Sequence, residues 1–273
     1  MAFALLAALW LLAAGSLAAV ALHPSWMPAL ASAEGAHVDH QMAVSIAILL
    51  ALFCAAQSAL GFLVWRGRGR VTQPSSVRAQ PGIEAGFTLI TLFIFAGLAW
   101  SGARSLAQVR SDQRANGAPL QVEVSGVQFA WYFHYPGADG MLGPTRPELV
   151  DASAGNAGAI GLDAQAPSAQ DDIVTQVLVL PVGREVELKL RAQDVIHSFF
   201  VPELRFKQDA VPGRVNMLRF RPSRAGDYEI ACAQLCGLGH YKMRASLRVV
   251  GQEEYEYWLR SHASPSLSSR RTR

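Results

Sequence analysis

The chain has 273 residues, of which 51% are hydrophobic, and a formal net charge of +3. This length exceeds that of an ordinary single soluble domain. The apolar residues concentrate in three blocks before residue 104, and the remainder has the composition of a soluble protein. The distribution argues against a polytopic transporter and predicts a membrane-anchored domain.

The apolar blocks cover residues 3–22, 43–65 and 86–103, and none of them contains Asp, Glu, Lys or Arg. About 20 such residues span the hydrocarbon core of a bilayer. We therefore expect a transmembrane hairpin within residues 40–108, with helices at about 43–65 and 86–103. Residues 1–33 are either a signal peptide, with a possible cleavage site at Ala31 and Ala33, or an additional transmembrane helix.

The charges between the blocks predict an orientation. No Lys or Arg occurs in residues 23–42, whereas the loop between the second and third blocks contains Arg66, Arg68, Arg70 and Arg78. The positive-inside rule places that loop in the cytoplasm, although three further arginines just beyond the third block oppose the assignment. We expect a multi-pass protein of a bacterial-type inner membrane, in contact with lipid, with its C-terminal domain on the periplasmic side.

Residues 115–262 show the alternation typical of β-strands. Val122 and Val124 share one face, and past Gly126 the apolar phase shifts to the odd-numbered residues 127–135. A phase shift at a glycine predicts a β-bulge. Alternation returns at 186–190 and 243–249, which favours an antiparallel sandwich or barrel.

Three segments of the C-terminal part of the chain lack this alternation. Residues 137–172 lack periodicity and predict a long loop, residues 251–262 predict a short helix, and residues 263–273 predict a disordered tail. The loop carries six acidic residues against Arg146 alone. We hypothesise that it helps to dock a basic redox partner, which neutralising Asp163, Asp171 and Asp172 would test.

Four potential metal ligands lie within twelve residues: Cys232, Cys236, His240 and Met243. Thiolate and thioether are soft donors that favour copper over zinc. Two thiolates can bridge two metal ions, and His197 is the obvious further ligand. A plain disulfide between the cysteines is the alternative, but it would not explain the histidines and the methionine.

These motifs resemble subunit II of cytochrome c oxidase, in the haem–copper oxidase family. The resemblance rests on the Cys-x-x-x-Cys-Gly-x-x-His-x-x-Met spacing and on residues 194–202 and 206–214 around His197. It implies an N-terminal helical hairpin with a C-terminal all-β cupredoxin-like sandwich. It also implies a binuclear copper A centre, in which the backbone carbonyl of Gln234 is a further donor.

Three further positions gain a meaning from the resemblance. Gln234 stands where the family often has a Glu that helps to hold magnesium beside subunit I, so magnesium binding is in doubt. Phe129 stands where a Trp is thought to admit electrons, and entry could instead use Trp131, Phe133 or Tyr135, unless the aromatic run is merely core. Glu84 resembles a residue at the mouth of a proton-uptake path, or is a solvated interfacial acid.

The function implied is electron entry into an aerobic terminal oxidase. Cytochrome c would reduce the copper pair, which would pass electrons to haem in subunit I for oxygen reduction with proton pumping. No catalytic residue and no nucleic-acid partner are expected in this chain. The alternatives are a quinol oxidase subunit, a copper A subunit of nitric oxide or nitrous oxide reduction, and a copper-storage or delivery protein.

Overall fold

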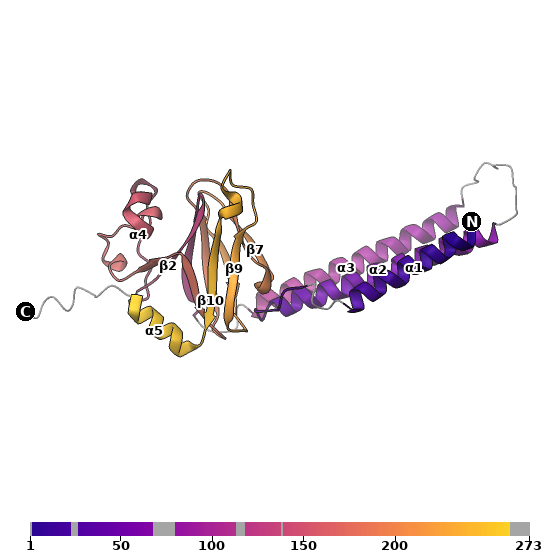
Figure 1. Cartoon of the computed structure of the whole chain (residues 1–273), viewed down its shortest axis with the longest axis horizontal. Helices are drawn as coiled ribbons and strands as arrows, with labels where there is room; N and C mark the ends of the chain where they lie inside the picture. Colours follow the sequence, from indigo (N-terminus) through magenta and orange to yellow (C-terminus); the bar gives the residue numbers. More distant parts are fainter. Residues whose placement is uncertain (1, 23–26, 68–79, 113–117, 138, 263–273) are drawn as a thin grey trace, which may run out of the picture. The chain divides into compact units, whose positions relative to one another are not determined.

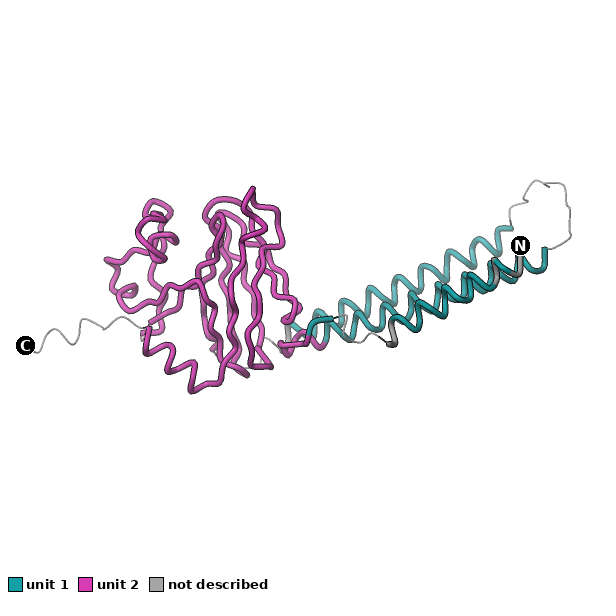
Figure 2. Tube along the Cα trace, viewed as in Figure 1, with its two compact units in different colours: residues 1–28, 37–110 teal, residues 29–36, 111–273 magenta. Residues whose placement is uncertain are grey.

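The computed structural model describes residues 2–22, 27–67, 80–112, 118–137 and 139–262. The chain divides into two compact units (Figure 2). The first comprises residues 1–28 and 37–110, and the second comprises residues 29–36 and 111–273. The tail expected over residues 263–273 lies outside the described residues.

The first unit is helical (Figure 1). Its helices are α1 (Ala2–Leu22), α2 (Gly35–Arg66) and α3 (Pro81–Asp112), and the two expected hairpin helices lie inside α2 and α3. Both α2 and α3 are long and apolar enough to cross a membrane. Their apolar side chains are largely exposed, as lipid-facing side chains would be.

The second unit is a sandwich of two five-stranded sheets, which confirms the predicted fold. One sheet has the order β3-β2-β1-β5-β8 and the other has the order β4-β10-β9-β6-β7. The strands of the first sheet are β1 (Leu120–Val127), β2 (Ala130–Tyr135), β3 (Ile173–Thr175), β5 (Val186–Ala192) and β8 (Asn216–Phe220). Those of the second sheet are β4 (Val177–Pro181), β6 (His197–Val201), β7 (Phe206–Ala210), β9 (Gly226–Cys232) and β10 (Arg244–Val250).

The alternating residues form the core between the sheets. Val122, Val124, Leu188 and Leu190 are completely buried from one sheet, and Leu247 is completely buried from the other. Their neighbours along each strand point to the outer faces, because side chains alternate along a strand. Fully burying one such side chain stabilises the fold by about 1.5–3 kcal/mol.

Two expectations about the strands need correction. Each sheet contains one parallel pair, β1 with β5 and β4 with β10, so the sandwich is not wholly antiparallel. The phase shift past Gly126 is a tight hairpin rather than a bulge, since β1 continues to Val127 and pairs it with Ala130 across a two-residue turn. The turn consists of Gln128 and Phe129. An apolar pattern shifts phase equally well when the chain reverses.

The stretch expected to be one long loop, residues 137–172, contains short helices. They are the 3-10 helices Pro147–Leu149, Ala152–Ala154 and Pro167–Ala169, together with the α-helix α4 (Gly155–Ala159). We call residues 137–172 the insertion. Elements of three to five residues are too short to show a hydrophobic period, so the sequence pattern missed them.

A segment before the membrane hairpin belongs to the sandwich unit. Within residues 29–36, the N–H of Ala31 donates to the carbonyl of Glu203 (2.8 Å), and the N–H of Ala33 donates to the carbonyl of Arg221 (3.0 Å). Ala31 is fully buried in the core. The residues of the possible cleavage site are therefore part of the folded domain.

The expected C-terminal helix is α5 (Gln252–His262), with two acidic residues in its first turn and two basic residues in its last turn. This charge order complements the helix dipole. Tyr255 is buried, and Trp258 and Leu259 pack against the same core. The amphipathic pattern therefore predicted this helix correctly.

Candidate metal centre

The loop between β9 and β10 carries four of the predicted ligands. Cys232 is the last residue of β9, and Met243 lies directly before β10. The N–H of Cys232 donates to the carbonyl of Met243 (3.1 Å), which closes the loop at its base. His240 begins a 3-10 helix within the loop, and its Nδ1 lies 3.6 Å from the Sγ of Cys236. Chain reversal between two neighbouring strands thus gathers these ligands.

The fifth side chain comes from another strand. His197 is the first residue of β6, which pairs with β9 so that Phe199 lies opposite Cys232. The ring of His197 is completely buried and packs closely on Gly126, where an added Cβ would lie 2.8 Å from a ring carbon. The absence of a side chain at position 126 makes room for the histidine.

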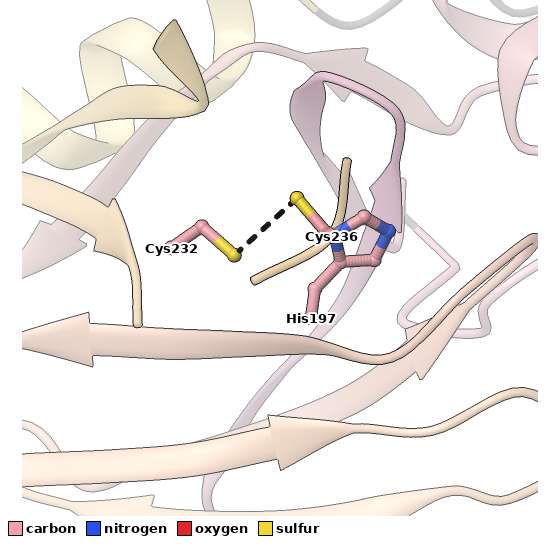
Figure 3. Close-up of side chains that lie close together, drawn as sticks. All are labelled: His197, Cys232 and Cys236. Carbon is pink, nitrogen blue, oxygen red and sulfur yellow. Dashed lines mark hydrogen bonds between the residues drawn. The ribbon is translucent and has the colours of Figure 1, made fainter. Parts of the chain in front are cut away.

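The two ring nitrogens of His197 differ in their surroundings. Nε2 lies 2.8 Å from the carboxylate of Asp194. Nδ1 is buried and has no hydrogen-bond partner among the described residues. A carboxylate that holds one imidazole nitrogen leaves the other to bind a metal. A ring nitrogen of His197 and the sulfurs of Cys232 and Cys236 lie within 4.8 Å of one another (Figure 3).

The remaining donors converge on the same point. The two cysteine sulfurs are 3.9 Å apart, and the Sγ of Cys236 is 3.7 Å from the Sδ of Met243. The backbone carbonyl of Gln234 lies 3.1 Å from the Sγ of Cys232. A disulfide bond is about 2.0 Å long, so both cysteines are free thiols. All six predicted donors therefore lie in one cluster.

Burial raises the pKa of one sulfur in the cluster. Desolvation, followed by the neighbouring Cys232, raises the pKa of Cys236 to about 11, so this sulfur carries a proton at neutral pH without a metal. A metal must displace that proton to bind the thiolate. Partial burial alone would raise the pKa of Asp194. Hydrogen bonds from the N–H of Gln128, from His197 and from the N–H of Val195 instead hold it below its ordinary value.

The donor set fits copper. Two thiols and a thioether offer three soft sulfurs, and the imidazoles of His197 and His240 suit the same metal. The Nδ1 of His197 is buried and has no hydrogen-bond partner among the described residues, which costs about 1–3 kcal/mol, and its lone pair is available to a metal ion. The cluster therefore offers ligand types that suit copper, together with an imidazole nitrogen that has a free lone pair.

The two aromatic candidates for electron entry lie at different depths. Phe129 is 37% exposed at the hairpin tip, and its ring lies so close to Gly237 and Gly239 that a Cβ at either glycine would meet it within 3.2 Å. Trp131 is 1% exposed and contacts the ring of His197 edge-on, with 5.9 Å between the ring centroids. Phe129 can touch another protein, whereas Trp131 contacts the ligand from inside.

Two further residues, Asp194 and Gln128, lie beside the site and were not predicted from the sequence. Asp194 begins the stretch 194–202 that carries part of the family resemblance, and Gln128 precedes Phe129, and both bond to segments that carry predicted ligands. An acid three residues before a ligand histidine was a usable signal for Asp194. No local signal pointed to Gln128, because its partners lie 66 and 108 residues away.

The remaining candidate lies apart from the cluster. Glu84 is an exposed residue in the first turn of α3, in the other unit of the chain. The carbonyl of Glu84 accepts a hydrogen bond from the Thr88 hydroxyl at 2.9 Å. The role in proton uptake that was suggested for Glu84 would therefore involve the helical unit and not the candidate metal centre.

Comparison with known proteins identifies the family of the chain. A family model described as the periplasmic domain of cytochrome c oxidase subunit II matches residues 120–250. The alternative cytochrome c oxidase subunit 2 of Bradyrhizobium diazoefficiens is 33% identical over 260 residues, which cover 92% of this chain and 89% of the relative. A probable cytochrome c oxidase subunit 2 of Streptomyces avermitilis is 31% identical, covering 77% of this chain and 72% of the relative.

A solved structure also aligns with the chain. It is the crystal structure of the periplasmic domain of cytochrome oxidase subunit II from Bradyrhizobium japonicum, at 26% identity and a TM-score of 0.39. The alignment covers 53% of this chain and 94% of that structure.

A β-sandwich that gathers soft ligands, in one chain with helices able to cross a bilayer, defines a class of membrane-anchored metal-binding proteins. The family model and the Bradyrhizobium diazoefficiens relative narrow that class. The chain belongs to the cytochrome c oxidase subunit II family, whose members are components of an oxidoreductase complex.

Proposed function

We propose that this chain is the electron-accepting subunit of an aerobic terminal oxidase and holds a binuclear copper A centre. The observation that carries the proposal is the buried Nδ1 of His197, which lacks a partner among the described residues, beside two free thiols 3.9 Å apart. The ligands would be His197, Cys232, Cys236, His240, Met243 and the carbonyl of Gln234. A bound copper pair supplies a one-electron carrier whose charge change is shared between two ions.

The protein holds the ligands in place before the metal arrives. His197 and Met243 are completely buried, and the two cysteines are nearly so. Ligands fixed by a packed core move little when the charge of the site changes, which suits fast electron transfer. The exposed side chain of Gln234 is a neutral amide, so we assign this residue a role through its backbone carbonyl.

Electrons enter, in this proposal, over the hairpin tip. The donor is a separate cytochrome c that contacts the exposed Phe129, whose ring packs on the ligand loop at Gly237 and Gly239. Trp131 lies beneath, against the ring of His197. The acceptor is a haem in subunit I, where oxygen is reduced and protons are pumped.

The helices α2 and α3 anchor the chain in the inner membrane. With the arginine-containing loop between them in the cytoplasm, the sandwich lies on the periplasmic side, where cytochrome c is available. Glu84, in the first turn of α3, would then lie at the cytoplasmic surface. There it could give protons from the cytoplasm a path toward subunit I.

The test is a substrate panel with the purified complex. Reduced cytochrome c and a quinol are offered as donors, and oxygen and nitric oxide as acceptors. The proposal expects rapid oxidation of cytochrome c with oxygen. Oxidation of quinol but not of cytochrome c would indicate a quinol oxidase, and turnover with nitric oxide alone would indicate a nitric oxide reductase.

A further inference from the structure

The tip of the β1–β2 hairpin lies between the two segments that carry the metal ligands. The backbone N–H of Gln128 donates to Oδ2 of Asp194 at 2.7 Å. The side-chain amide of the same residue donates to the carbonyl of Cys236 at 2.5 Å. One turn residue therefore bonds to both sides of the candidate centre.

Asp194 extends this connection to the first histidine. Its Oδ1 lies 2.8 Å from Nε2 of His197 and accepts the N–H of Val195 at 2.7 Å. A continuous chain of hydrogen bonds thus runs from the His197 ring through Asp194 and Gln128 to Cys236. It joins the start of β6, which carries His197, to the loop between β9 and β10, which carries Cys236.

The ligand loop needs such support. Its base is closed by the bond between the backbones of Cys232 and Met243, but its middle is open to solvent, with Leu235 76% exposed and Leu238 98% exposed. Cys236 lies in this middle part. The Phe129 ring packs on Gly237 and Gly239, and the side-chain amide of Gln128 bonds the backbone of Cys236 itself to the hairpin.

We propose that Gln128 is a positioning residue of the metal centre, fixing the separation of His197 from Cys236. This inference rests on the proposed function, since the centre it positions is the copper site. Gln128 is not itself a ligand: its amide nitrogen is occupied as a donor to the Cys236 carbonyl. Residues that orient ligands in this way tune metal affinity by about 10- to 100-fold.

The experiment uses the full chain in its complex, loaded with copper. The variants are Gln128→Ala, which removes the amide, and Gln128→Glu, which keeps its shape but loses the donor. Both retain the backbone N–H that bonds to Asp194. The matched control is Gln121→Ala, in which another exposed glutamine of the same hairpin loses its bonds to Glu187 and Lys189. Three quantities are measured: the rate of copper removal by a chelator, the copper hyperfine pattern, and the reduction potential.

Both Gln128 variants are expected to lose copper about 10- to 100-fold faster than the wild type, with an altered hyperfine pattern and a shifted potential. The Gln121 variant is expected to match the wild type. Wild-type copper retention, hyperfine pattern and potential in both Gln128 variants would overturn the inference, even if their thermal stability fell. Failure of the wild type itself to bind two copper ions would instead refute the proposed function.

Discussion

Two buried histidines of the sandwich each lie beside an aspartate, and only one of them lies at the candidate metal centre. His197 pairs with Asp194 at 2.8 Å, and His134 pairs with Asp172 at 2.6 Å. In both rings Nε2 faces the carboxylate and Nδ1 is buried without a hydrogen-bond partner in the described part of the chain. The pairing by itself therefore does not identify a functional site.

The two histidine–aspartate pairs differ in the groups that surround them. Asp172 also accepts the N–H groups of Gly137 and Gly143, so it fastens the insertion to β2. A ring nitrogen of His197 instead lies within 4.8 Å of two cysteine sulfurs. The His134–Asp172 pair is surrounded by backbone amides, as in a structural pair. The His197–Asp194 pair lies beside two cysteine sulfurs, which are soft metal donors.

The largest expected effect is the loss of copper binding when a cysteine of the candidate metal centre is replaced. Replacing Cys236 with Ser removes one thiolate that both ions would share, so we expect the two-copper signal to vanish and the copper content of the full chain to fall below one ion. The matched control is Cys54→Ser, since Cys54 lies in α2 of the helical unit. Copper analysis beside the absorption spectrum checks this. A retained two-copper spectrum in the Cys236 variant would refute the ligand assignment.

The second expected effect is a loss of folding stability without a change in copper binding, produced by a substitution at the His134–Asp172 pair. Asp172→Ala leaves His134 and two backbone amides without their buried acceptor, which should destabilise the sandwich by about 3–5 kcal/mol. Chemical unfolding of the purified protein measures the loss. The copper spectrum of the folded fraction should stay that of the wild type, and a changed spectrum would mean that the two regions are coupled.

The converse substitution should act on copper. Asp194→Asn weakens the hold on Nε2 of His197, so copper affinity should fall by about 10- to 100-fold. Asp194 is partly exposed, so the accompanying loss in stability should be smaller than that caused by Asp172→Ala. Competition with a copper chelator gives the affinity. Equal losses of stability in the two variants, with unchanged copper affinity, would erase the distinction between the pairs.

The smallest effect concerns the surface of the insertion. The side chain of Asp172 is fully buried and Asp163 pairs with Arg146, so neutralising them would disturb the fold as well as the charge. Glu148 is exposed in a 3-10 helix and offers a cleaner test. If the insertion steers a basic donor, Glu148→Gln should slightly flatten the salt dependence of cytochrome c oxidation. An unchanged slope would leave the insertion without a docking role.

The sequence predicted the features whose residues lie close together along the chain, and it missed those that depend on residues far apart. Cys232 to Met243 form one loop, so their spacing alone indicated a shared site, and His197 followed from its chemistry. Alternation likewise predicted β5 and β10. The roles of Asp194 and Gln128 depend on contacts between elements, which no local pattern records.

The errors have equally physical causes. The phase shift at Gly126 fits a bulge and a hairpin alike, and only the pairing of Val127 with Ala130 decides between them. The insertion consists of elements too short for a period. His134 drew no attention because its partner lies 38 residues away, across the insertion.

In the proposed function, this chain holds two copper ions that share one electron. The most direct test is electron paramagnetic resonance of the copper-loaded full chain, purified in its partly oxidised form, with copper and protein counted in the same sample. We expect two copper ions per chain and a seven-line hyperfine pattern, because the unpaired electron interacts equally with both nuclei. A four-line pattern with one ion per chain would contradict this proposal.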